Sequence, residues 1–284
     1  MARRLRAAIL SRLSTTHLWL LSCCLFASFG CELAQNYTDP HGPRYAGSYA
    51  VEGEHPHPPE VGVVTFNIAF ADEYELAAQE LALDPKLSTA DILLLQEMDA
   101  PRTDAIAQAL HMNYVYYPAS VHRNGRDFGN AVLSRFPIVA DQKLILPHKN
   151  PTDGRIRIAV QATVATPQGD ISAYSVHTET PWLGPRARLE QSAAIIEHAS
   201  ASPVRSLAGG DFNTGDPGSL DATIALFREH DFAWASADAG DTAGGYALDH
   251  IFAREITPLR SGSVMTQASD HRPSWAELSL DRAQ

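Results

Sequence analysis

The chain has 284 residues, of which 45% are hydrophobic, and a formal net charge of −11 at pH 7. This length and apolar content exclude a disordered protein and suit one large domain with an appendage. The acidic balance argues against a protein that clings to nucleic acid non-specifically, because such binding depends on many Lys and Arg side chains that neutralise phosphates.

Residues 1–31 have the pattern of an export signal. Four arginines precede an apolar run from Leu18 to Ala27 that is too short to span a bilayer comfortably. The stretch from Ala27 to Cys31 resembles a bacterial lipoprotein cleavage box, in which the cysteine becomes the lipidated first residue. An ordinary secretory signal explains the same segment equally well. Either way, the exported chain that lacks residues 1–30 has a net charge of −15.

The cysteines lie only in this first part of the chain, at positions 23, 24 and 31. The rest of the protein therefore holds no internal disulfide and depends on packing for its stability. Residues 32–60 are punctuated by Pro and Gly and have no apolar period, which predicts a flexible linker. We expect one globular domain over residues 61–281.

The pattern of apolar residues predicts alternating strands and helices in this domain. In chain order we expect a strand over 61–67, a helix over 73–87, a strand over 91–97, a helix over 101–111, strands over 114–117, 131–134, 138–146, 155–165 and 171–177, a helix over 184–200, a strand over 204–208, a helix over 220–229, and strands over 247–253 and 273–280. The turn over 166–170 predicts a hairpin, and hence antiparallel pairing.

Polar side chains come at the ends of several predicted strands. Asn67 ends the first strand, and Glu97 ends the strand over 91–97. Asp211 and Asn213 follow the apolar run 204–208 and two glycines, and strand alternation turns both to one side. An ordinary turn rich in Asp, Asn and Gly has the same kind of sequence. This stretch alone therefore does not distinguish a functional site from a structural turn.

Seven segments taken together resemble the endonuclease/exonuclease/phosphatase superfamily, in the order that the family has. They are 65–67, 95–97, 129–135, His177, 210–213, 248–252 and 269–273. The resemblance implies an α/β (α+β) fold, a four-layer sandwich of two packed, mostly antiparallel sheets flanked by helices. The strands and hairpins that the apolar pattern predicts agree with this fold.

The resemblance also implies a phosphoester hydrolase that depends on Mg²⁺, with Mn²⁺ as a possible substitute. Glu97 is the expected metal ligand, with Asn67 and Asp270 as companions, and oxygen ligands of this kind suit a hard cation. Since the reaction also needs an oriented water and donors for developing charge, catalytic side chains are expected beside the metal.

The expected catalytic residues are Asp211, Asn213, Asp249 and His271, together with His177. By the resemblance, Asp211 orients and deprotonates the attacking water, while Asn213 fixes Asp211 or donates to the phosphate. His271 contacts the phosphoryl group and Asp249 sets its tautomer. His177 matches the second histidine of the deoxyribonuclease and sphingomyelinase branches.

Asn130 and Arg126 are the expected contacts to the substrate phosphate. The substrate itself stays open between a nucleic acid, cleaved as by an endonuclease, and a phospholipid, a sugar phosphate or another small phosphodiester. A non-catalytic module that binds phosphate-bearing ligands is a third alternative. We expect a monomer that is exported, and either tethered to the cell envelope through a lipidated Cys31 or secreted.

Overall fold

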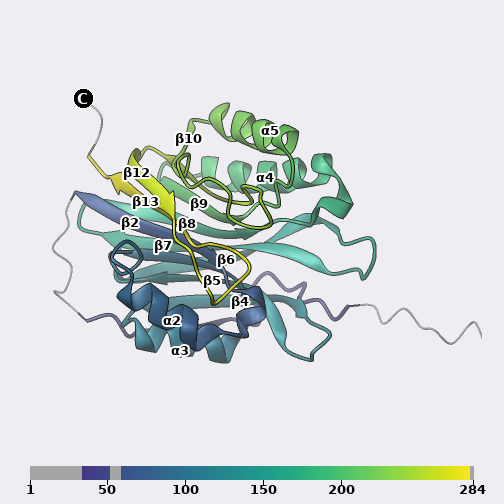
Figure 1. The fold of residues 1–284 in the computed structure, drawn as a ribbon, viewed down its shortest axis with the longest axis horizontal. Coiled ribbons are helices and arrows are strands. Elements are labelled where there is room, and N and C mark those ends of the chain that lie inside the picture. Colours follow the sequence, from purple (N-terminus) through teal and green to yellow (C-terminus); the bar gives the residue numbers. More distant parts are fainter. Residues whose placement is uncertain (1–33, 52–58, 282–284) are drawn as a thin grey trace, which may run out of the picture. The chain divides into compact units, whose positions relative to one another are not determined.

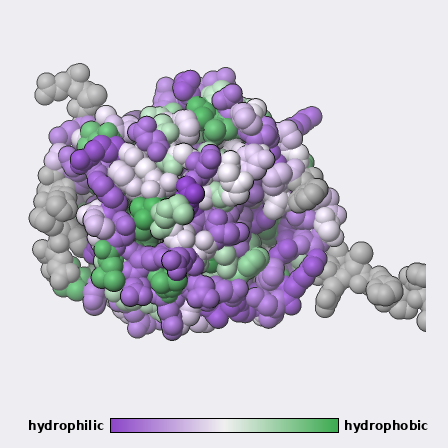
Figure 2. Space-filling model, in the orientation of Figure 1, coloured by the Kyte–Doolittle hydropathy of each residue, from purple (hydrophilic) through white to green (hydrophobic). Residues whose placement is uncertain are grey.

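The computed structural model describes residues 34–51 and 59–281. The expected export signal, with Cys31, lies outside the described residues. Within the described part, no helix is long and apolar enough to cross a membrane. The face of the domain in Figure 2 is mostly hydrophilic, with hydrophobic residues in small separate patches.

Two β-sheets form the centre of the domain (Figure 1). The first has seven strands, in the spatial order β1 (Tyr45–Gly47), β4 (Asn113–Val121), β5 (Asp127–Ser134), β3 (Ile92–Met98), β2 (Glu60–Asn67), β13 (Ser274–Ser279) and β12 (Thr257–Ser263). The second has six, in the order β10 (Phe232–Trp234), β11 (Asp249–Arg254), β9 (Arg205–Asp211), β8 (Gly169–His177), β7 (Ile156–Thr166) and β6 (Ile138–Lys149).

The helices flank the two sheets and complete the layers. They are η1 (Ala69–Ala71), α2 (Tyr74–Leu83), α3 (Ala100–Ala109), η2 (Pro181–Leu183), α4 (Pro185–Ser200) and α5 (Pro217–Arg228). Asp99 and Asp216 start α3 and α5, because each side chain accepts a hydrogen bond from a backbone N–H of the first turn. Both sheets are mixed, with parallel pairing only for β2–β3 and β8–β9 among the described strands. The predicted sandwich is confirmed.

Alternation along the strands builds the core between the sheets and the two outer cores. On β2, Val63 packs in the cluster between the sheets, whereas Phe66 packs in the cluster that includes α2 and α3. On β9, Leu207 faces the other sheet and Ala208 packs with residues of α4 and α5. Each central strand is therefore apolar on both faces, as its continuous apolar sequence requires.

The topology brings the polar strand ends together. Because β2 and β3 run parallel, Asn67 and Glu97 leave the first sheet at the same edge. In the second sheet, parallel pairing sets His177 opposite Asp211, and antiparallel pairing sets Asp249 opposite Asp211. The predicted strand-end residues thus converge because of strand order and direction.

The structure differs from the expected flexible linker over residues 34–51. Strand β1 pairs with β4, and Tyr37 and Val121 take part in backbone hydrogen bonds that dock the preceding residues beside β4. The buried ammonium of Lys143 donates to the carbonyls of Tyr37 at 3.0 Å and Gly42 at 2.7 Å. The prediction of flexibility from Pro and Gly content was wrong here, because residues distant in the sequence hold this segment in place.

Candidate active site

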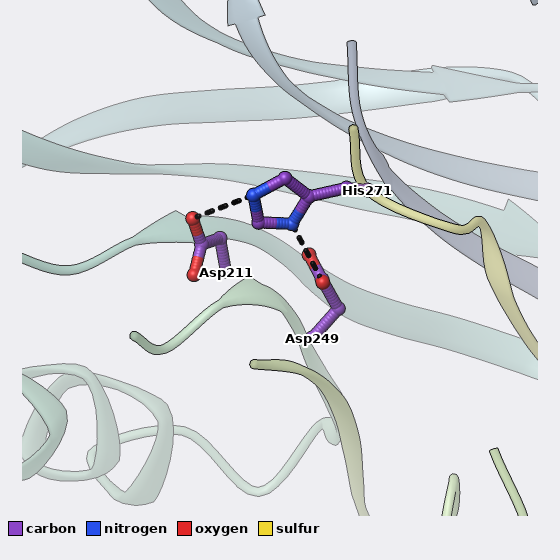
Figure 3. A group of neighbouring side chains, drawn as sticks. All are labelled: Asp211, Asp249 and His271. Carbon is purple, nitrogen blue, oxygen red and sulfur yellow. Dashed lines mark hydrogen bonds and ion pairs between the residues drawn. The ribbon is translucent and has the colours of Figure 1, made fainter. Parts of the chain in front are cut away.

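Asp249 and His271 form a hydrogen-bonded pair at the centre of the site (Figure 3). His271 Nδ1 lies 2.8 Å from Asp249 Oδ2, and the Thr242 hydroxyl donates to the same oxygen at 2.6 Å. Burial lowers the pKa of His271, but the negative charges of Asp249, Asp211 and Asp270 raise it more, to about 10. The imidazole is therefore a cation at neutral pH, with its proton on Nδ1 directed to Asp249.

Asp211 lies on the other side of the imidazole. Its Oδ2 is 3.9 Å from His271 Nε2, too far for a hydrogen bond, so both groups keep capacity for a third partner. Burial raises the pKa of Asp211 to about 7 against the opposing effect of His271. The backbone N–H of Asn213 donates to Asp211 Oδ1 at 2.9 Å, and the Asn213 side chain donates to the Thr178 carbonyl. Asn213 thus holds Asp211 through its backbone.

Asn67 connects Asp211 with Glu97. Its Nδ2 donates to Glu97 Oε1 at 3.2 Å and to Asp211 Oδ2 at 3.1 Å. Glu97 has a positive φ of 61°, which turns its side chain out of the strand pattern, and its Oε2 accepts from the backbone N–H of Phe70. Burial raises the pKa of Glu97, and Arg157 opposes that rise. Two carboxylates therefore converge on one amide nitrogen.

His177 is buried beside Asp211, with its Nε2 3.4 Å from Asp211 Oδ2. Arg157 NH1 lies 3.2 Å from the other ring nitrogen, Nδ1, and 2.9 Å from Nε2. Burial, with the positive charges of Arg157 and His271, lowers the pKa of His177 well below its usual value. The neutral ring can accept a hydrogen bond from Arg157, which is a permanent donor.

Sequence reasoning missed Arg157 and Glu179 as members of this site. Arg157 NH2 lies 3.3 Å from Glu179 Oε1, which also accepts from Asn150 and from the backbone of Thr180. The signal was present in the alternation of arginines with isoleucines over 155–158, because a half-buried arginine on a strand needs an acidic partner.

Three residues that were predicted to bind the phosphate or the metal make other contacts: Asn130, Arg126 and Asp270. The Asn130 amide donates to the carbonyls of Ile158 at 3.0 Å and Ser175 at 3.1 Å, so its N–H groups join the two sheets and are not free for a phosphate. Arg126 donates to the Phe70 carbonyl and to Asp72 Oδ1, beside the Glu97 turn.

Asp270 is exposed, in contrast to the other expected metal ligands. Its one hydrogen bond within the described residues is a 3.4 Å contact with the Ser269 hydroxyl. The structure brings Glu97 and Asn67 together but does not join Asp270 to them. Asp270 acts on the site at longer range, by raising the pKa of His271.

The oxygen donors at the site fit a divalent cation. Asp211, Asp249 and His271 place one ligand atom each within 4.8 Å of one another and could hold a metal ion. However, the imidazole of His271 is protonated and its Nδ1 is bonded to Asp249, so a metal at Nε2 would have to displace the Nε2 proton. The buried carboxylate of Glu97, beside the Asn67 carboxamide, fits better, because burial raises the pKa of Glu97 and a hard cation would relieve this.

Residues 64–271 match the model of the Endonuclease/Exonuclease/phosphatase family. The chain belongs to this family. Members of the family are typically phosphoester hydrolases and are generally dependent on divalent metals. The predicted resemblance is confirmed over most of the domain.

Solved structures of the family share the fold. An endonuclease/exonuclease/phosphatase from Beutenbergia cavernae has a TM-score of 0.64 and 24% identity, covering 78% of this chain and 72% of that one. A D. rerio TDP2 humanized by 14 mutations has a TM-score of 0.61 and 15% identity over 78% and 99%. A mannosyl-6-phosphatase from Bacteroides thetaiotaomicron has a TM-score of 0.57 and 20% identity over 77% and 99%. No curated protein sequence matches the chain.

Proposed function

We propose that the protein is a Mg²⁺-dependent hydrolase of phosphodiester bonds. The observation that carries this proposal is the row Asp249, His271 and Asp211, in which a protonated imidazole lies between a hydrogen-bonded carboxylate and a second carboxylate 3.9 Å away. This row places a cationic hydrogen-bond donor, His271, beside a general base, Asp211. Phosphoryl transfer needs both groups at the same phosphorus.

The two groups divide the proton chemistry between them. Asp211, with a pKa of about 7, is able to accept the proton of an attacking water at neutral pH. His271 donates from Nε2 to a phosphoryl oxygen, because its Nδ1 proton is committed to Asp249. Neutral His177 supports Asp211 from the side of Arg157. A Mg²⁺ ion held by Glu97 and Asn67 would supply positive charge to the phosphate oxygens when bound.

In the absence of a bound metal, the charged side chains at the site repel a diester less than a monoester. Three carboxylates, of Glu97, Asp211 and Asp249, face two cationic groups, of His271 and Arg157. A phosphomonoester brings a charge near −2 to this site at neutral pH, whereas a diester brings −1. The diester is therefore repelled less by the carboxylates.

The first test is metal removal. Protein dialysed against EDTA should lose hydrolysis of bis(p-nitrophenyl) phosphate, because Glu97 and Asp211 cannot neutralise the phosphate, and added Mg²⁺ or Mn²⁺ should restore it. The rate with p-nitrophenyl phosphate, a monoester, should be lower at every metal concentration. Undiminished turnover after exhaustive chelation would rule out the proposal, and a preference for the monoester would favour a phosphatase.

A Glu97→Gln substitution tests the metal assignment. The amide keeps an acceptor for the Phe70 N–H but removes the charge, so the Mg²⁺ concentration for half-maximal activity should rise by at least about tenfold. Circular dichroism should show an unchanged thermal transition. Glu229→Gln, an exposed carboxylate at the end of α5, is the matched control. Normal metal activation in Glu97→Gln would show that another residue binds the metal.

A further inference from the structure

Three rings, Phe70, His122 and Phe128, form a cluster that touches the catalytic residues, and we name it the aromatic shelf. The ring centroids of Phe70 and His122 are 4.4 Å apart, and those of Phe70 and Phe128 are 5.7 Å apart. Phe128 also lies 5.7 Å from His177, which contacts Asp211. His177 therefore lies between Phe128 of the shelf and Asp211, the proposed general base.

Phe70 reaches the shelf on an unusual turn. Ala69, Phe70 and Ala71 have φ values of 37°, 60° and 53°, a left-handed run that residues with a Cβ rarely adopt. The turn persists because polar groups of the site hold it: Asn67 Oδ1 accepts from Ala69 N, and Glu97 Oε2 accepts from Phe70 N.

Arg126 holds the same turn from the opposite side, by donating to the Phe70 carbonyl. The turn leaves the Phe70 ring partly exposed, although an apolar side chain of this size usually gains by burial. Strain that is maintained beside an active site, and that keeps an apolar ring in contact with water, indicates a binding role for that ring.

Cationic groups surround the shelf. The guanidinium carbons of Arg155 and Arg157 lie 5.9 and 5.5 Å from the centre of the Phe128 ring. Burial and the charge of Arg155 lower the pKa of His122, so its ring is neutral and able to stack. Arg155 is paired with Asp153 and Arg157 with Glu179, and both guanidinium groups lie over the Phe128 ring, where a quaternary ammonium headgroup would have to compete with them. A planar group attached to an anionic phosphate could stack on the rings while the phosphate is attracted to Arg155 and Arg157.

We propose that the aromatic shelf stacks the base of a nucleotide next to the scissile phosphate, which makes the substrate a nucleotide phosphodiester. This inference rests on the proposed phosphodiesterase function and adds the substrate class to it. Phe70 is the ring that would contact the base, because it is partly exposed whereas Phe128 is buried. Arg155 and Arg157 are placed to attract the negative charge that accompanies the base.

Two esters with the same leaving group provide the test. Thymidine 5′-(p-nitrophenyl) phosphate and methyl p-nitrophenyl phosphate differ in whether a nucleoside or a methyl group is present on the retained side, and the Phe70 variants separate the contribution of the base. The ratio of their kcat/KM values should favour the thymidine ester in the unchanged protein, and Phe70→Leu should lower that ratio by about five- to hundredfold. Phe70→Trp, which keeps a ring, should preserve it. Tyr45→Leu, which removes a partly exposed aromatic ring from β1, is the control.

The outcomes separate the two proposals. Hydrolysis of the methyl ester reports on the phosphodiesterase function, and the ratio of the two esters reports on the shelf. If neither ester is cleaved, calorimetric binding of thymidine 5′-phosphate against deoxyribose 5-phosphate still tests the shelf, and Phe70→Leu should weaken the first only. A ratio that Phe70→Leu does not change, or equal binding of both phosphates, would overturn the inference.

Discussion

One oxygen of Asp249, Oδ2, holds the His271 imidazole in position. Oδ2 accepts both the Thr242 hydroxyl and the His271 Nδ1 proton, while the buried Oδ1 has no hydrogen-bond partner among the described residues. A buried carboxylate with one unsatisfied oxygen is costly, unless its charge is used. Here that charge keeps His271 protonated, so the cost is offset by a cation that faces the substrate.

This coupling predicts non-additive losses. Asp249→Asn should leave the imidazole in place but remove the charge and the tautomer preference, so kcat/KM should fall about 10²- to 10⁴-fold on a cleavable phosphodiester. His271→Ala should cost a comparable factor. The double variant should be little worse than either single one, because two groups that act as one unit are lost together.

Steady-state kinetics on all four proteins tests this expectation, with the loss expected mainly in kcat. Glu255→Gln, an exposed carboxylate at the turn after β11, is the control for removal of a charge elsewhere in the domain. If the two losses simply multiply, Asp249 and His271 act independently, and the hydrogen bond of 2.8 Å between them has no catalytic role.

At the scale of elements, the strands that carry the site were predictable because they are short, apolar and bounded by polar residues. The predicted strands over 91–97 and 171–177 match β3 and β8 within two residues at each end, with His177 at the end of β8 and Glu97 one residue before the end of β3. Strand β12 was not predicted, because Pro258 and Gly262 weaken its pattern and it pairs at an edge with a bulge. Strands β1 and β10, of three residues each, are too short to show a period.

The site residues that sequence reasoning missed or misplaced depend on contacts across the sandwich. Asn130 was expected to contact the substrate phosphate, but it lies inside β5 and bonds to carbonyls of the other sheet. Thr242 orients Asp249 from a loop without any periodic pattern. Glu179 meets Arg157 only because β7 and β8 are paired. Such partners follow from register, which a single sequence does not specify.

Gly210 shows how closely the two central strands of the second sheet approach. A Cβ at this position would lie 1.8 Å from the Val176 carbonyl oxygen, and its φ of 156° belongs to a region that suits glycine. Gly210 therefore allows the close approach of β9 to β8, whereas Gly209 makes room for the Leu94 side chain of the first sheet.

A Gly210→Ala substitution should consequently destabilise the domain by about 3 kcal/mol, because β8 and β9 must separate to admit a methyl group. Activity should fall as well, since Asp211 is the next residue. Urea unfolding measures the first effect and hydrolysis of the phosphodiester the second. Gly215→Ala is the control, because its Cβ would meet Pro181 at an ordinary 3.5 Å. Equal stability of the two variants would contradict the clash.

At the scale of the whole molecule, the segment before β2 is part of the domain. Arg44 and Asp141 form a two-pronged ion pair with distances of 2.6 Å, and Asn36 bonds to backbone groups of Gly154 and Ile156. These contacts tie the segment to the second sheet, and β1 joins it to the first sheet through β4. In the sequence, only two residues separate Cys31 from the first described residue. If Cys31 carries a lipid, residues 34–51 do not act as a long spacer between that lipid and the domain.

The proposed lipid anchor gives the last prediction. Cys31→Ser removes the thiol that would carry the lipid, so the protein should move from the membrane pellet to the soluble fraction after ultracentrifugation. The acidic chain, with a net charge of −15 without residues 1–30, should not bind the anionic membrane surface by itself. Cys24→Ser, which removes a thiol from the apolar run but keeps Cys31, is the control and should still pellet. Pelleting of Cys31→Ser to the same extent would contradict the lipoprotein proposal and favour a secreted enzyme.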